Sequence, residues 1–134
     1  MAMGFVPSRI NQGHMQGWEY LPAGAITPKV GLALTQTSGL LTVASGTTRP
    51  TYLCMMESGT ALTAGDIIPV IHVDDNALYD VTNSAAFTSI KVGDKVTISA
   101  DGMQVTATKT DGVAEVVNIG DTAVGSEITV RFPG

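Results

Sequence analysis

The sequence has little charge, a single cysteine and no long hydrophobic run. Only 14% of its 134 residues are charged, and seven basic residues stand against twelve acidic ones, for a net charge of -5. A negative balance with scattered basic residues disfavours nucleic-acid binding, which needs clustered Lys and Arg. The lone Cys54 excludes an intrachain disulfide framework. No apolar run is long enough to cross a bilayer, so we expect no membrane partner.

The scarcity of charge also bears on the surface. Soluble monomers usually carry more charge, so we expect part of this surface to be covered by other protein. Hydrophobic residues make up 44% of the chain, which excludes a disordered protein, and 134 residues suffice for one domain with its own core. The first residues lack the apolar segment of a secretory signal, so we expect no export by that route.

Motifs that carry chemistry are scarce as well. The sequence has no Gly-x-Ser-x-Gly elbow and no glycine-rich phosphate loop. Asp74, Asp75 and Asp80 cluster around a turn, but their spacing does not match a calcium-binding loop. Two histidines and one cysteine without paired spacing do not make a zinc site. We therefore expect a structural or binding protein with no cofactor, no metal and no catalytic residue, and a small β-barrel enzyme is the least favoured class.

Short alternating segments separated by turn residues fill the chain from residue 23 onward. Between residues 91 and 120, Asp101-Gly102 and Asp111-Gly112 separate three expected antiparallel strands, with φ above zero expected at both glycines. Pro69 lies inside another segment and indicates an edge strand or a bulge. Further strands are expected at residues 30–34, 40–44, 51–57, 67–73, 78–82 and 125–132, with a turn at Ser38-Gly39 that joins the first two as a hairpin. About eight short, mostly antiparallel strands predict an all-β fold, either a small β-barrel or a sandwich.

The first 22 residues have neither a strand nor a helix period. Glycines and prolines interrupt them, yet they contain large apolar residues and the only tryptophan. They form either an irregular arm that packs on its own domain or an arm that docks on a partner. We favour the second, with an extended docking arm at 1–22 and a single β-domain at 23–134 that stays folded without residues 1–21. The candidate docking residues are Phe5, Val6, Arg9, Ile10, Met15, Trp18 and Tyr20.

Three stretches of the sequence resemble the core of bacteriophage head decoration proteins: TPKVGLAL at 27–34, GLLTVA at 39–44 and RPTYL at 49–53. Residues 92–98 and 128–132 are similar to the small β-domains of capsid auxiliary proteins. Lambda-type decoration proteins also have an irregular N-terminal arm before a compact β-rich domain, although this chain has a longer C-terminal meander. The resemblance carries no catalytic residues.

The resemblance implies a viral structural protein that decorates and stabilises the outer surface of a bacteriophage capsid. Its partner would be the major capsid protein, and it would form a homo-oligomer, with a trimer favoured. It would be made in the host cytoplasm and act on the virion. The alternative is a carbohydrate- or cell-surface-binding β-module, for which Tyr52, Tyr79, Phe87 and Phe132 are few and dispersed.

Overall fold

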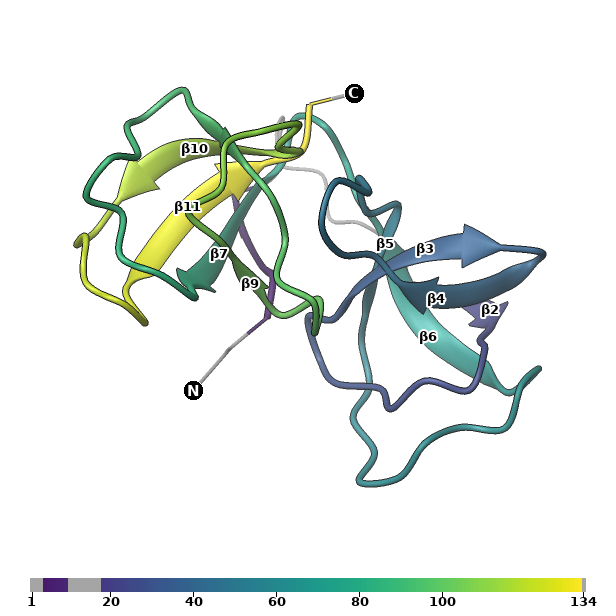
Figure 1. The fold of residues 1–134 in the computed structure, drawn as a ribbon. Coiled ribbons are helices and arrows are strands. Elements are labelled where there is room, and N and C mark those ends of the chain that lie inside the picture. The colour runs from purple at the N-terminus through teal and green to yellow at the C-terminus, as the bar shows by residue number, and fades with distance from the viewer. Residues whose placement is uncertain (1–3, 10–17, 134) are drawn as a thin grey trace.

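The described part of the chain contains eleven strands, which form two sheets (Figure 1). The computed structural model describes residues 4–9 and 18–133. The strands are β1 (Val6–Arg9), β2 (Trp18–Pro22), β3 (Ala33–Thr37), β4 (Leu40–Val43), β5 (Tyr52–Cys54), β6 (Ile67–His72), β7 (Leu78–Asn83), β8 (Lys95–Val96), β9 (Gln104–Val105), β10 (Ala114–Ile119) and β11 (Glu127–Arg131). The described residues contain no helix, and so none that could cross a membrane. The expected all-β class is confirmed, as a sandwich-like pair of sheets and not as a closed barrel.

The two sheets form two lobes that lie side by side. Sheet A has six strands in the order β1-β7-β11-β10-β8, and β9 pairs in parallel with β7. Sheet B has five strands in the order β2-β6-β5-β3-β4, all antiparallel to their neighbours. Figure 1 shows β7, β10 and β11 in one lobe and β3, β4 and β6 in the other. Residues 73–77 connect the lobes, because they join β6 to β7.

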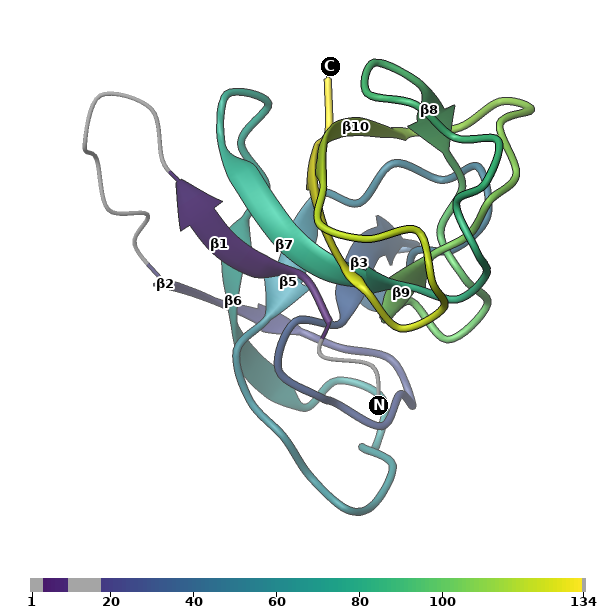
Figure 2. The same cartoon turned by 90° about the vertical axis from the view of Figure 1, so that its left-hand side faces the viewer.

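The N-terminal segment runs antiparallel to residues 67–83 through both lobes (Figure 2). β1 pairs with β7, with Val6 opposite Asp80, and β2 pairs with β6, with Trp18 opposite Ile71. The local structure expected for residues 1–22, an irregular arm, is therefore corrected: its described parts are strands of the two sheets. The two strands are hard to recognise in the sequence because strand formation depends on cross-strand neighbours. Here those neighbours lie at least 45 residues away in the chain, the separation of Pro22 and Ile67.

The centre of sheet B has a hydrophobic core on each face. Ala33, Leu53 and Ile71, on β3, β5 and β6, face a large core shared with sheet A. Because side chains alternate along a strand, the adjacent residues face a smaller core that sheet B encloses. The smaller core contains Ala23, Leu32, Leu34, Leu41, Cys54, Ile68, Val70 and Met103. Burial on both faces explains why the segment that forms β6 reads as a nearly continuous apolar run.

Pro69 lies inside sheet B, so the expected edge strand or bulge is wrong. β6 has β2 on one side and β5 on the other. The carbonyl of Pro69 accepts a hydrogen bond from the N–H of Met55 at 3.0 Å, one residue past the end of β5. In a residue other than proline, the N–H at position 69 would point toward β5 as well. The missing hydrogen bond therefore falls just beyond the end of β5, where the pairing of the two strands already stops.

Turn chemistry was predicted well at one hairpin and partly at the others. Ser38 and Gly39, with φ of 52° and 82°, form the turn between β3 and β4, as a primed hairpin turn requires. Gly102 also has a positive φ of 71°, as expected. At the next turn the expectation is wrong, because Asp111 has a φ of 54° and Gly112 lies outside the positive region.

The stretch from 91 to 120 forms fewer strand pairs than its alternation predicts. β8 pairs with β10, while β9 pairs in parallel with β7, so the three strands are not a simple meander. Part of the expected ladder between the first two strands does form, as an isolated bridge between Ile98 and Val105 and backbone hydrogen bonds that join residues 97–99 to residues 104–108. β9 also pairs with β7, and the alternation of apolar and polar residues within 91–120 cannot specify that distant partner.

Candidate functional site: an uncharged strip on strands β2 and β6

The outer face of sheet B extends beyond the area that sheet A covers. Opposite residues of an antiparallel pair share a face, so Trp18 and Tyr20 on β2 lie on the face that carries Ile67 and Ile71 on β6. Ile71 is buried in the large core, whereas Trp18, Tyr20 and Ile67 are 56%, 65% and 60% exposed. We call this surface the β2–β6 strip, defined by Trp18, Tyr20, Pro22, Ile67 and Pro69.

The β2–β6 strip contains no charged residue. Its three most exposed side chains together offer about 300–400 Å² of largely apolar surface, since a large aromatic side chain buries about 150–250 Å² when fully covered. An apolar patch of that size is comparable with the largest patch on a typical soluble monomer, and such patches often have a function. The strip can bind another molecule by apolar burial and ring packing, and its side chains provide no acid, base or metal ligand.

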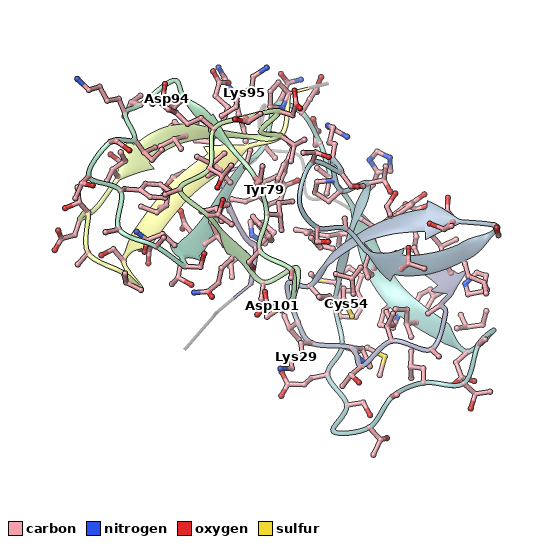
Figure 3. The ribbon with its side chains drawn as sticks, in the orientation of Figure 1. Lys29, Cys54, Tyr79, Asp94, Lys95 and Asp101 are labelled. Atoms are coloured by element: carbon pink, nitrogen blue, oxygen red, sulfur yellow. The ribbon has the colours of Figure 1, made fainter. Side chains whose placement is uncertain are left out.

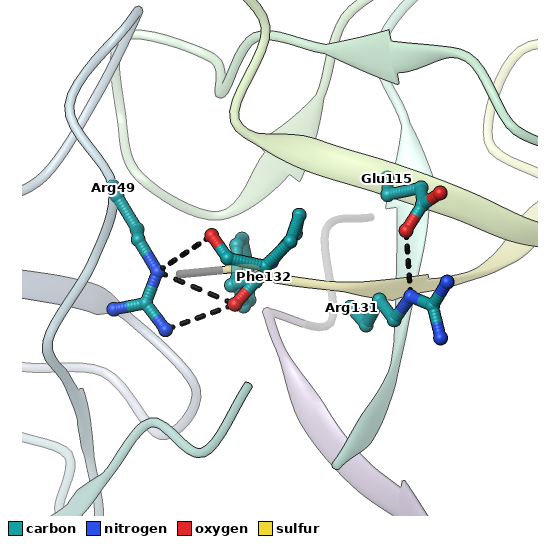
Figure 4. Close-up of polar contacts among 5 residues, drawn as sticks. Arg49, Glu115, Arg131 and Phe132 are labelled. Carbon is teal, nitrogen blue, oxygen red and sulfur yellow. Dashed lines mark hydrogen bonds and ion pairs between the residues drawn. The ribbon is translucent and has the colours of Figure 1, made fainter. Parts of the chain in front are cut away.

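The outer face of sheet A differs because its polar side chains bind one another. The Nε of Arg131 donates to Oε1 of Glu115 at 2.6 Å (Figure 4), and the hydroxyl of Thr129 donates to Asp80 at 2.8 Å. The hydrogen bond from Arg131 lowers the pKa of Glu115, so the stability this pair gives is lost as the pH falls through that lowered pKa. Figure 3 shows Asp94 and Lys95 on the rim of the same lobe. A face of paired polar groups is a weaker docking candidate than the strip.

Two of the three clustered acidic residues, Asp74 in the turn and Asp80 in β7, make hydrogen bonds within the fold. One carboxylate oxygen of Asp74 accepts the N–H of Asn76 at 2.9 Å, and Asp80 accepts the Thr129 hydroxyl. Within residues 4–9 and 18–133, no three or more His, Cys, Asp and Glu side chains group closely enough to hold a metal ion.

A hollow of about 430 Å³ lies beside this turn, and its lining residues are Arg49, His72, Val73, Asp74 and Asp75. Arg49 acts there as a clamp on the end of β11. Its Nη2 donates to the carbonyl of Phe132 at 2.9 Å, and its Nε donates to that of Pro133 at 3.2 Å (Figure 4). Because carbonyl groups of the chain already engage the guanidinium, the hollow is not a strong candidate for binding an anion.

Cys54 is a core residue, as expected. Its side chain is fully buried in the smaller core, and Figure 3 shows it away from Tyr79, which belongs to the large core. Burial raises the pKa of the Cys54 thiol, because the thiolate would lose its hydration. A thiol held in its protonated form is a poor nucleophile.

The candidate docking residues separate into three groups. Trp18 and Tyr20 lie together on the β2–β6 strip, whereas Val6 is exposed on β1, in the other sheet. Phe5 is fully buried in the large core, so this structure does not present its ring to a partner. Ile10 and Met15 lie outside the described residues, and Arg9 is described only by its backbone, next to Leu78 in the β1–β7 pair.

Ile67 is the most exposed residue of the strip that was not among the candidate docking residues. It begins an apolar run and therefore reads as core. Strand alternation could have found it, because Ile67, Pro69 and Ile71 share one face and Ile68 and Val70 the other. What alternation cannot supply is which part of that face the second sheet covers.

The fold is that of an all-β domain built from two sheets. The sequence matches no known family model and no curated protein sequence. Among solved structures, the chain is similar in fold to the N base of the head fiber protein gp8.5 of bacteriophage phi29, with a TM-score of 0.55. The two are 21% identical, and the match covers 88% of this chain and 94% of that chain. At that identity the likeness shows a common fold.

Proposed function

We propose that this chain is a structural protein of a bacteriophage virion that decorates and stabilises the outer surface of the capsid. The observation that carries the proposal is the likeness in fold to the base of a phage head fiber, which extends over 88% of this chain. The resemblance of residues 27–53 to head decoration proteins supports the same class from the sequence. The proposed role is binding and not catalysis, by a protein made in the host cytoplasm.

The proposed partner is the major capsid protein, and the proposed contact is the β2–β6 strip. Burial of one large aromatic side chain contributes about 1.5–3 kcal/mol, whereas association costs about 4–15 kcal/mol in lost freedom of motion. One strip therefore binds weakly, but a capsid repeats the same site many times, and linked strips multiply their affinities. Val6, Arg9, Ile10 and Met15 remain predicted contacts, while Phe5 is left out because it is fully buried.

The first prediction concerns capsid binding by the two exposed rings. The double variant Trp18→Ser and Tyr20→Ser is expected to bind capsids about 100-fold more weakly, because each lost ring removes about 1.5 kcal/mol or more. The measurement is co-sedimentation with capsids of the encoding virus assembled without this protein. The melting temperature should change little, since both side chains are more than half exposed.

The control removes exposed apolar side chains elsewhere on the surface. Val92→Ser with Val124→Ser alters two side chains, each 64% exposed, in loops of the sheet A lobe. This control should bind capsids as the wild type does. Equal binding by all three proteins would contradict the strip as the contact, and no binding by the wild type would contradict the proposed function.

The carbohydrate-binding alternative would use the same two rings. Two exposed aromatic side chains on one strand face can stack on sugar rings. Ligand sites usually also contain polar groups that fix the orientation of the ligand, and the strip has no charged side chain for that purpose. Trp18 is the only tryptophan, so its fluorescence reports directly on this surface. A saturable shift of its emission with soluble oligosaccharides, in wild-type protein that does not bind capsids, would favour this alternative.

The second prediction concerns assembly. We propose a homo-oligomer, with a trimer favoured by the resemblance, because the chain combines low charge with an exposed apolar strip. Light scattering at micromolar concentration should give a particle of three times the chain mass of 13.8 kDa. A particle of one chain mass, both free and released from capsids, would contradict the oligomer.

A further inference from the structure

Some backbone N–H and C=O groups of β2 point away from β6, the one described strand that pairs with it. The Pro69 carbonyl bonds to Met55, so the backbone groups of Pro69 point toward β5 and away from β2. Tyr20 lies opposite Pro69, and in an antiparallel pair opposite residues either face each other or both face away. The N–H and C=O of Tyr20 therefore point out of the sheet, and those of Trp18 do too.

A second contact gives the same direction independently. The N–H of Ala23 donates to the carbonyl of Asp66 at 2.8 Å, so Ala23 faces the β6 side. Alternation along β2 then turns Tyr20, three residues earlier, to the opposite side. On that side β4 reaches only the end of β2, where Leu41 bridges to Ala23 and accepts the N–H of Gly24 at 2.9 Å. No described strand pairs with Trp18 or Tyr20 along this edge.

The other sheet edges are protected in the ways that natural proteins use. β1 contains Pro7 and a register shift, and β8 is two residues long with the exposed Lys95. The edge of β4 is partly covered, because the Leu41 carbonyl accepts a hydrogen bond from the N–H of Gly24. Residues 18–21 of β2 have no proline, no lysine and no bulge, and an edge of that kind readily pairs with another strand. The same residues carry the exposed rings of the β2–β6 strip.

We propose that the edge of β2 at Trp18 and Tyr20 receives an extended segment of the capsid partner as an added strand, an inference that rests on the proposed function. Such a segment bonds to the outward N–H and C=O groups, and its alternate apolar side chains pack beside the two rings. On the other face it meets Glu19, which is exposed and favours a Lys or Arg opposite. The fitting partner is thus an extended segment with uncharged apolar residues at every second position.

The third prediction compares proline and alanine at one position. Tyr20→Ala and Tyr20→Pro both remove the ring, but Tyr20→Pro also removes the outward N–H, which strand addition uses and the free domain does not. Tyr20→Pro should therefore bind capsids at least about 10-fold more weakly than Tyr20→Ala, with the same melting temperature. As a directional control, Glu19→Pro removes an N–H that faces β6 and should lower the melting temperature of the free protein.

Amide hydrogen exchange of the wild type provides the second readout. The Tyr20 amide should exchange quickly in the free protein and at least about 10-fold more slowly on capsids, while the Leu21 amide is protected in both states. Equal capsid binding by Tyr20→Pro and Tyr20→Ala, or a protected Tyr20 amide in the free protein, would overturn the added strand but not the capsid contact. Protection that rises with protein concentration alone would identify a second copy as the occupant, and would also overturn the proposal.

Discussion

Replacing Phe5 with alanine is expected to cost about 3–5 kcal/mol of unfolding free energy, because it leaves a cavity in the large core. Phe5 is fully buried, and its ring packs edge-on against Phe132 with the centroids 5.2 Å apart. The ring of Phe132 also packs against the ring of Tyr79, with the centroids 5.6 Å apart. Three parts of the chain that are distant in sequence therefore meet at this cluster. Equilibrium denaturation in urea measures the loss, which is a large share of the stability of a typical domain.

The control for Phe5→Ala is the next residue in the chain. Val6 is 41% exposed, so Val6→Ala should cost less than about 1 kcal/mol. Deleting residues 1–21 should go further and unfold the domain, because the deletion removes β1 and most of β2 together with Phe5. A truncated protein with the circular dichroism and melting temperature of the full chain would instead support the separable arm expected from the sequence.

The N-terminal segment shows where sequence reasoning fails in this protein. Its large apolar residues are visible in the sequence, but the period of two that marks a strand is interrupted by glycine and proline. Gly4 is one such residue, and the structure requires it. Its φ is 70°, and a Cβ there would lie 2.9 Å from the backbone of Gly31, while the N–H of Phe5 donates to the Gly31 carbonyl. A residue that reads as a strand breaker therefore permits the close crossing that inserts Phe5 into the core.

Closeness in sequence made the β3–β4 hairpin predictable, but not residues 91–120, where the expected meander forms only in part. The hairpin of β3 and β4 needs only its own alternation and the Ser38-Gly39 turn, and both are visible in the sequence. The strip was predicted only in part, since Trp18 and Tyr20 were candidates and Ile67 was not. Exposure on one face of β6 depends on how far sheet A extends over sheet B, and no local pattern encodes that distance.

Substitution of Gly112 is the other change with a large expected effect on stability, and the physical reason differs from the one that the sequence suggests. Asp111-Gly112 reads as a turn in which glycine supplies a positive φ, but Asp111 has that φ. A Cβ on Gly112 would lie 2.4 Å from the carbonyl carbon and oxygen of Lys95. Lys95 belongs to β8, whose pairing with β10 places the fully buried Val96 opposite Ala114.

Gly112→Ala is therefore expected to cost about 1–3 kcal/mol or more of unfolding free energy, because the added methyl group pushes β8 away from β10 and disturbs the packing of Val96.

The variant Gly112→Asn, measured by urea denaturation, distinguishes a steric requirement for glycine from a requirement for a positive φ. Asparagine tolerates a positive φ better than alanine, so it would rescue a requirement for φ but not a steric one. We expect Gly112→Asn to destabilise the protein at least as much as Gly112→Ala does. Gly59→Ala, where a Cβ meets no atom within 4 Å and φ is not positive, should leave stability nearly unchanged. A clear recovery with asparagine would restore the turn geometry first expected for this position.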